Sequence, residues 1–115
     1  MLVVRLKPYL RAMSRMGFDD AGMRTIEAAI IAAPQAHPMI QGLKGVRKAR
    51  FARPGAGKSG GGRVIYYVAL TPDRLFMMTA YPKSQRDDLS SEQRKTILAA
   101  IESIKGGRRT SSGRS

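Results

Sequence analysis

The chain has 115 residues, the length of one small domain with a single hydrophobic core, which excludes a large two-domain enzyme. It carries 21 Lys and Arg residues against 8 Asp and Glu residues, so its formal net charge is +13. A small fold with this excess is expected to bind a polyanion, a membrane surface or an acidic protein. The chain has no cysteine and only one histidine, which excludes thiolate chemistry and argues against a histidine-based metal site or catalytic triad. We expect no metal and no cofactor.

Apolar runs in this sequence are short. The apolar run at the N-terminus is interrupted by Arg5, and it is too short for a signal peptide. Later runs, such as Ala28–Ala33 with six residues, are far shorter than a membrane-spanning helix needs. We therefore expect a cytoplasmic protein that has no membrane partner.

The first half of the chain predicts a strand followed by two helices. Residues 2–6 have the composition of a short strand. Residues 9–16 are a short basic stretch whose own pattern leaves its type open, and the layout counts it as the first helix. Two aspartates then stand at the N-cap position of an amphipathic helix over residues 20–33. Residues 34–45 are predicted to form a loop.

The second half predicts three consecutive strands and a last helix. The strands cover residues 46–51, 64–70 and 75–81, and the helix covers residues 91–105 behind a capping box made by Ser90 and Gln93. This order is an α+β layout with two N-terminal helices and a C-terminal helix on a small, mostly antiparallel sheet. We expect one domain over residues 1–106 and a disordered basic tail over residues 107–115, which lacks apolar side chains.

The glycine-rich stretch over residues 54–62 matches two nucleotide-binding patterns only superficially. Gly55–Gly60 fits the dinucleotide fingerprint, and Gly57-Lys58-Ser59 resembles the end of a phosphate-binding loop. Both patterns need a helix after the glycines, because the helix N-terminus binds the phosphate. Here a strand is predicted to follow, so we interpret the stretch as a hairpin connection.

A basic segment without a carboxylate extends from Ala28 to Pro72. Its cations alternate with apolar residues on predicted strands, so the fold holds like charges close together. A polyanion relieves the resulting repulsion, and nucleic acid is the favoured partner over a membrane surface or an acidic protein. The cations predicted to bind it are Lys44, Arg47, Lys48, Arg50 and Arg53 within the segment and Arg86 beyond it, next to Lys58 and Arg63.

The register of the second hairpin decides whether Arg63, Tyr81 and Lys83 meet. Directly opposed residues of an antiparallel pair share one face. A turn of three or five residues makes the numbers of paired residues add up to 146, which places Arg63 opposite Lys83 and Tyr81 on the same face. A turn of two or four residues gives 145 and separates Arg63 from Tyr81. We predict the even sum, because it gathers these side chains beside Lys58.

Such a cluster suits RNA cleavage without a metal, in which the ribose 2′-hydroxyl attacks the neighbouring phosphate. An arginine stabilises the phosphorane, because its guanidinium matches phosphate oxygens. A lysine among other cations acts as base or acid when its pKa is lowered. A tyrosine moves a proton or stacks a base.

Four stretches together resemble the RelE/HigB-type toxins of bacterial toxin–antitoxin systems, which belong to the RelE/ParE superfamily. These stretches are Gly42–Arg50, Gly57–Tyr67, Tyr81-Pro82-Lys83 and Asp87–Gln93. The resemblance implies a RelE-like fold and a ribosome-dependent mRNA endonuclease (an mRNA interferase) that arrests translation. It also implies a cognate antitoxin, often a helix-turn-helix protein. The chain would contact operator DNA only through this antitoxin.

The resemblance also implies roles for individual residues. Arg63 would stabilise the phosphate, Lys58 and Lys83 would contact phosphate or act as acid–base groups, and Tyr81 would stack or position a base. Arg50 and Arg86 would be accessory cations, while which residue is the general base stays open. His37 lies outside the matched stretches and is interpreted as a loop residue.

Two other functions fit the same sequence. ParE-type proteins of this superfamily inhibit DNA gyrase and cleave nothing. A non-catalytic module that binds RNA or the ribosome, or an inactive relic of a toxin, has the same composition. The number of candidate catalytic cations favours the nuclease.

Overall fold

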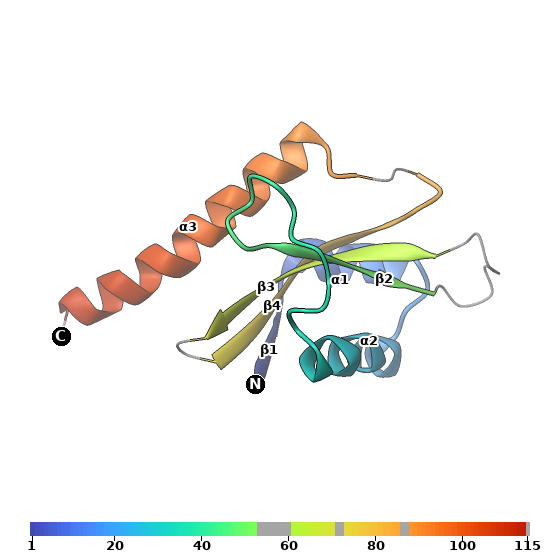
Figure 1. Cartoon of the computed structure of the whole chain (residues 1–115), viewed down its shortest axis with the longest axis horizontal. Helices are drawn as coiled ribbons and strands as arrows, with labels where there is room; N and C mark the ends of the chain where they lie inside the picture. The colour runs from blue at the N-terminus through green and yellow to red at the C-terminus, as the bar shows by residue number, and fades with distance from the viewer. Residues whose placement is uncertain (53–60, 71–72, 86–87, 115) are drawn as a thin grey trace.

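The structure is a computed structural model, which describes residues 1–52, 61–70, 73–85 and 88–114, with side chains up to residue 106. Four strands form one mixed sheet in the order β1-β4-β3-β2, in which β1 is parallel to β4 and the other neighbours are antiparallel. This confirms the predicted α+β fold with a mostly antiparallel sheet, two N-terminal helices and a C-terminal helix (Figure 1). The elements are β1 (Leu2–Arg5), α1 (Lys7–Arg15), α2 (Asp20–Ala32), β2 (Arg47–Phe51), β3 (Gly62–Leu70), β4 (Asp73–Pro82) and α3 (Ser91–Arg114).

Each face of the sheet carries its own apolar cluster. On one face, α1 and α2 contribute residues such as Tyr9, Met13 and Ile30, which pack with Val64 and Tyr66 of β3. On the other face, α3 lies over the sheet with Ile97 and Ile101 facing inward. Apolar side chains therefore alternate between the two layers along β3, and both faces of its central part are buried.

Local signals explain where the helices begin and end. The carboxylate of Asp19 accepts a hydrogen bond from the Gly22 amide at 2.8 Å, which makes Asp19 the N-cap of α2. Ser90 and Gln93 exchange the two hydrogen bonds of the predicted capping box at the start of α3. The stretch left open over residues 9–16 is α1, which has Pro8 in its first turn.

An ion-paired group ties α2 to β1 and α1. Glu27 is buried, and its carboxylate accepts hydrogen bonds from the Arg5 guanidinium at 2.8 and 2.9 Å and from the Tyr9 hydroxyl at 2.9 Å. Burial, followed by the hydrogen bond to Glu27, raises the pKa of Tyr9 far above its ordinary value. The hydrogen bond to Glu27 also raises the pKa of Arg5. The hydrogen bonds from Arg5 and Tyr9 compensate for the burial of the Glu27 carboxylate.

The segment between α2 and β2 is irregular, as predicted, but it is also part of the core. Its backbone turns back on itself through a hydrogen bond from the Ile40 amide to the Val46 carbonyl at 2.8 Å. Ile40, Leu43 and Val46 are buried against Ile97 and Ile101 of α3. The segment between α2 and β2 therefore forms part of the apolar surface against which α3 packs.

The predicted register of the β3–β4 hairpin is wrong. Leu70 pairs with Asp73, so only two residues connect the strands, and the numbers of paired residues add up to 143 as far as Tyr66 and Met77. A bulge at Met78 then raises the value to 144, from Ile65 and Thr79 to the end of the ladder. The sum near Arg63 is therefore even, and Arg63 and Tyr81 share one face as predicted, but the cause is a bulge and not a longer turn.

The last helix is longer than predicted. The sequence predicts an end at residue 105 and a disordered tail over 107–115, whereas the backbone of α3 continues to Arg114 and includes Gly106 and Gly107. The division into a domain of residues 1–106 and a separate tail stays a prediction. No described helix is long and apolar enough to span a bilayer.

Candidate nucleic-acid interface

Three neighbouring strands bring three of the predicted site residues into one row. Arg50 of β2 lies directly opposite Arg63 of β3, and Arg63 lies directly opposite Tyr81 of β4. Directly opposed residues share a face, so all three belong to the face that α3 partly covers. Lys48 lies two residues from Arg50 along β2 and belongs to the same face.

A cavity of about 540 Å³ opens beside this row. Its lining includes the three cations Lys48, Arg50 and Arg63, together with His37 and Pro38. Arg63 is only 5% exposed, and its Nη1 donates a hydrogen bond to the Gly62 carbonyl at 3.1 Å. Arg50 is exposed and Lys48 is half-buried. The cavity therefore has one deep, held guanidinium and two cations nearer to solvent, an arrangement suited to a phosphate group.

Gly62 makes room for the start of this strand. A Cβ at Gly62 would lie 2.5 Å from the ring of Phe51, which is the residue opposite it on β2. The Phe51 ring in turn meets the ring of Phe18 edge to face, with centroids 5.2 Å apart. The glycine before Arg63 is thus needed for packing on one face, while Arg63 faces the other.

Tyr81 shares the face of Arg63, as predicted, but it is not an exposed ring, and Lys83 does not lie opposite Arg63. Tyr81 is 3% exposed and belongs to the apolar cluster beneath α3, so its ring is not an open surface for a base. Lys83 is exposed, but it does not face Arg63. Its amide donates a hydrogen bond to the Gly61 carbonyl at 2.9 Å, which places Lys83 opposite Gly61 just beyond the end of β4.

Two of the predicted nucleic-acid contacts are engaged elsewhere in the fold. Arg47 lies on the opposite face of β2, and its Nη1 donates hydrogen bonds to the carbonyls of His37 at 2.7 Å and Gln35 at 3.3 Å. Lys44 forms an exposed ion pair with Glu102 of α3 at 2.8 Å. Arg47 therefore holds the segment before β2, and Lys44 contacts α3.

Three further predicted residues, Lys58, Arg53 and Arg86, lie outside the described residues. Their predicted roles stay predictions. The expectation that a strand and not a helix follows the glycine-rich stretch is confirmed, because β3 begins at Gly62.

The structure adds His37 to this region. The segment before β2 runs back along that strand, with Met39 bridged to Arg47 and the Lys48 amide bonded to the Pro38 carbonyl at 3.0 Å. This return brings His37 to the cavity, while its ring also meets the ring of Tyr66 edge to face. No sequence signal predicts the contact, because it depends on how an irregular segment folds.

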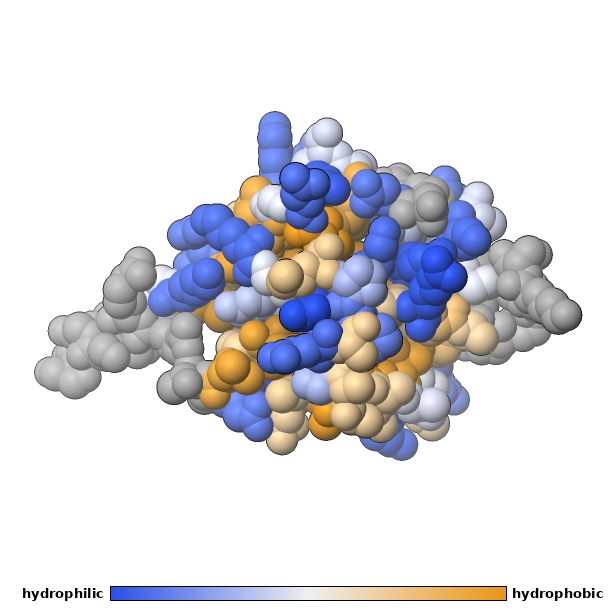
Figure 2. All heavy atoms as spheres, viewed as in Figure 1, coloured by the Kyte–Doolittle hydropathy of each residue, from blue (hydrophilic) through white to orange (hydrophobic). Residues whose placement is uncertain are grey.

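The charged side chains in the described lining of the cavity are all cations, namely Lys48, Arg50 and Arg63. Figure 2 shows hydrophilic side chains over much of the side in view, with apolar areas between them. No carboxylate lines the cavity among the described residues. Within the described part of the chain, no three His, Asp or Glu side chains come together as a metal site requires.

Burial raises the pKa of Tyr66, whose hydroxyl donates to the Pro34 carbonyl at 2.7 Å on the opposite side of the sheet.

Comparison with known proteins agrees with the resemblance described above. The structure is similar to that of a mutant of the E. coli toxin RelE in the free state, with a TM-score of 0.55 and 14% identity, covering 87% of this chain and 96% of that one. It is also similar to a conserved hypothetical protein from Helicobacter pylori, with a TM-score of 0.52 and 18% identity, covering 74% of this chain and 97% of that one. A family model described as the RelE toxin of the RelE/RelB toxin–antitoxin system matches residues 14–109, and the chain therefore belongs to the RelE toxin family.

Proposed function

We propose that this RelE-family toxin is an endoribonuclease that cleaves mRNA on the ribosome and so arrests translation. The observation that carries the proposal is the direct opposition of Arg50 and Arg63 on neighbouring strands, with Lys48 beside them around one cavity. Like charges placed directly opposite each other destabilise a sheet. A phosphate bound between them turns this repulsion into attraction.

The cleavage needs no water molecule in its first step. The 2′-oxygen of a ribose forms a bond to the adjacent phosphorus and gives up its proton to a base. The phosphorane collapses by breaking the bond to the 5′-oxygen, which takes a proton from an acid. The products are a 2′,3′-cyclic phosphate and a 5′-hydroxyl. Arg63 stabilises the charge on the phosphorane, since its buried guanidinium is held in place before substrate binds.

Other residues have supporting roles in this proposal. Lys48 and Arg50 bind neighbouring phosphates, and Lys58 and Lys83 are the candidates for base and acid. Tyr81, buried opposite Arg63, fits the role of a positioning residue better than that of an exposed stacking surface. The partners are mRNA with nearby ribosomal RNA, and a cognate antitoxin that links the toxin to operator DNA in the cytoplasm.

The test is mapping of mRNA 5′ ends after brief induction in a bacterial host. Wild type should create new 5′ ends inside translated codons, and Arg63→Ala should not. Arg63→Lys keeps the charge but loses the fork that contacts two oxygens, so it should retain only a small part of the cleavage. Lys95→Ala is the matched control, since it removes one exposed cation from α3 away from the cavity. Circular dichroism establishes that each variant is folded.

The remaining outcomes separate the alternatives. Growth arrest without new 5′ ends would replace the nuclease with a gyrase-directed toxin or a ribosome-blocking protein. Neither arrest nor new ends, from a folded and expressed chain, would leave an RNA-binding module or an inactive relative. Cleavage that persists in a folded Arg63→Ala variant would contradict the role of Arg63.

A further inference from the structure

Several contacts hold His37 at the cavity beside Arg63. The carbonyl of His37 accepts a hydrogen bond from Nη1 of Arg47 at 2.7 Å, and its ring meets the ring of Tyr66 edge to face, with centroids 6.1 Å apart. The next residue is fixed as well, because the Pro38 carbonyl accepts a hydrogen bond from the Lys48 amide at 3.0 Å. These contacts restrict where the imidazole can lie before any ligand binds, which is what a functional side chain requires.

The polar side chains that line this cavity are proton donors with one exception. Lys48, Arg50 and Arg63 carry N–H groups and no acceptor atom. The side chain of Pro38 has no polar group. A neutral imidazole has one ring nitrogen that accepts a proton. Among the described residues of the lining, His37 is therefore the one side chain able to take a proton from a substrate.

Cleavage by the ribose 2′-hydroxyl needs an acceptor as well as donors. The three cations supply donors for the phosphorane, but a charged ammonium or guanidinium group takes up no further proton. Neither lysine considered as a base has a described place in this lining. Lys58 lies outside the described residues, and Lys83 lies opposite Gly61, beyond the end of β4. The position of the base is thus open to another residue.

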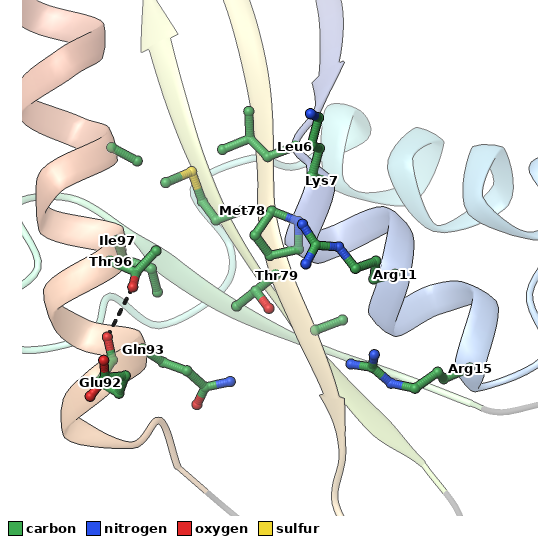
Figure 3. Close-up of a pocket in the computed structure, with 13 residues that line it drawn as sticks. Leu6, Lys7, Arg11, Arg15, Met78, Thr79, Glu92, Gln93, Thr96 and Ile97 are labelled. Carbon is green, nitrogen blue, oxygen red and sulfur yellow. Dashed lines mark hydrogen bonds between the residues drawn. The ribbon is translucent and has the colours of Figure 1, made fainter.

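A carboxylate is the other common general base, and Glu92 is the one carboxylate that must be considered. It lines a groove of about 520 Å³ between α1 and α3, where Figure 3 shows it on the first turn of α3. Neither Arg50 nor Arg63 lines that groove, and Glu92 does not line the cavity that they share with His37. Glu92 and the phosphate-binding cations therefore belong to different cavities.

We propose that His37 is the general base of the cleavage, an inference that rests on the proposed function. A ring nitrogen of His37 takes the proton of the 2′-hydroxyl while the 2′-oxygen forms its bond to phosphorus. The bond from phosphorus to the 5′-oxygen breaks, and this oxygen takes a proton from a lysine ammonium group. The products are the 2′,3′-cyclic phosphate and the 5′-hydroxyl. The imidazolium then gives its proton to water, and the lysine recovers one from water.

The test is single-turnover cleavage of mRNA on purified ribosomes by the full-length protein. His37→Ala should be slower by about 100-fold or more, since general bases contribute about 10²–10⁴-fold. His37→Phe keeps a ring beside Tyr66 but has no nitrogen, so it should lose as much. Gln35→Ala is the matched control, because it shortens an exposed side chain of the same segment outside the cavity, and its rate should stay within about twofold. Urea denaturation checks the fold of each variant.

Two further readouts separate a base from a residue that only supports the fold. The wild-type rate should rise with pH through the range in which an imidazole loses its proton, and His37→Ala should lack this rise. Added imidazole should restore part of the rate to His37→Ala and none to Arg63→Ala. The other described charged or titratable side chains around His37 are of types that titrate well above neutral pH. They are Lys48, Arg50, Arg63, Arg47 and Tyr66.

A substrate with sulfur in place of the leaving 5′-oxygen distinguishes a base from an acid, because a thiolate leaves without a proton. His37→Ala should stay slow on this substrate, whereas recovery to the wild-type rate would make His37 the acid and overturn the assignment. A wild-type rate in His37→Phe, an unchanged pH profile in His37→Ala, or no rescue by imidazole would also overturn it. In all these cases wild type still cleaves. Absence of cleavage by wild type would instead refute the proposed function, and the role of His37 with it.

Discussion

Arg63 lies directly opposite Tyr81, although the pairing that begins at Leu70 and Asp73 would, if continued unchanged, place it opposite Ala80. The extra residue at Met78 shifts the ladder by one and brings Arg63 and Tyr81 to the same face. The same face carries Arg50. The bulge in β4 is therefore what gathers the candidate site on one side of the sheet.

A pair of engineered cysteines tests this register, because the natural chain has none to compete. Val64→Cys with Ala80→Cys should form a disulfide on oxidation, since these residues are directly opposed. Val64→Cys with Thr79→Cys should not, since Thr79 faces the other side. Gel mobility with and without reductant measures both. The opposite pattern would mean that the bulge is absent.

Arg47 and Arg50 should respond differently to removal, although both are cations of the same strand. Arg47→Ala loses hydrogen bonds to the carbonyls of Gln35 and His37, and we expect a loss of about 1–3 kcal/mol in the free energy of unfolding. Arg50→Ala should change stability by less than about 0.5 kcal/mol. It should instead weaken RNA binding and reduce its salt dependence by about one counterion.

Urea denaturation and RNA titrations at several salt concentrations separate the two effects. Equal losses of stability for Arg47→Ala and Arg50→Ala would contradict the assignment of Arg47 to the opposite face. A normal salt dependence in Arg50→Ala would remove Arg50 from the phosphate contacts.

The buried carboxylate of Glu27 should be one of the most sensitive positions in the fold. Glu27→Gln leaves the Arg5 guanidinium without the anion that accepts two of its hydrogen bonds. We expect the free energy of unfolding to fall by about 3 kcal/mol, as for other buried pairs that lose one partner. Urea denaturation measures it, with Glu92→Gln on the exposed side of α3 as the control. Similar values for the two variants would show that the buried group contributes little.

The free energy of unfolding should fall at alkaline pH, because the hydroxyl of Tyr9 keeps its proton in the folded chain. Its pKa is raised in the folded chain, first by burial and then by the hydrogen bond to Glu27, so the unfolded chain releases this proton at lower pH than the folded one. The contribution of Tyr9 to the free energy of unfolding is thus complete below a pH of about 10 and is lost progressively as the pH rises above this value. Tyr9→Phe should cost about 1.5 kcal/mol at neutral pH.

Comparison of urea midpoints at two pH values, one near neutral and one above 10, tests this. The alkaline decline should be smaller in Tyr9→Phe than in wild type. A decline remains, because burial also raises the pKa of Tyr66. An identical decline in both proteins would show that Tyr9 does not keep its proton in the folded state.

The position of α3 should depend on its apolar contacts and not on the ion pair between Glu102 and Lys44. Ile101 is fully buried against the segment before β2, and Ile101→Ala should cost about 2–5 kcal/mol. The pair between Lys44 and Glu102 is exposed, and Lys44→Gln should cost less than about 1 kcal/mol. Hydrogen exchange of α3 amides and urea denaturation compare the two variants. A larger effect from Lys44→Gln would reverse this account.

Much of the fold was predictable because its signals are local. The N-cap at Asp19 and the capping box of Ser90 and Gln93 involve groups only three residues apart. The helical spacing over residues 20–33 and the β-branched and aromatic run over residues 64–70 are likewise read from neighbours. The end of α3 was not predicted correctly, because two glycines after residue 105 indicate a stop that the backbone does not make.

The sequence by itself determined the element order, the excess of positive charge and the family resemblance, because these depend on composition and on spacing within a few residues. Only the tertiary structure decided which cations meet. Arg50 and Arg63 come together through pairing across 13 residues of chain, whereas Arg47 faces away and Lys44 contacts α3. A single bulge at Met78 reverses the faces on which later residues of β4 lie, and nothing in the local pattern shows where one extra residue enters a strand.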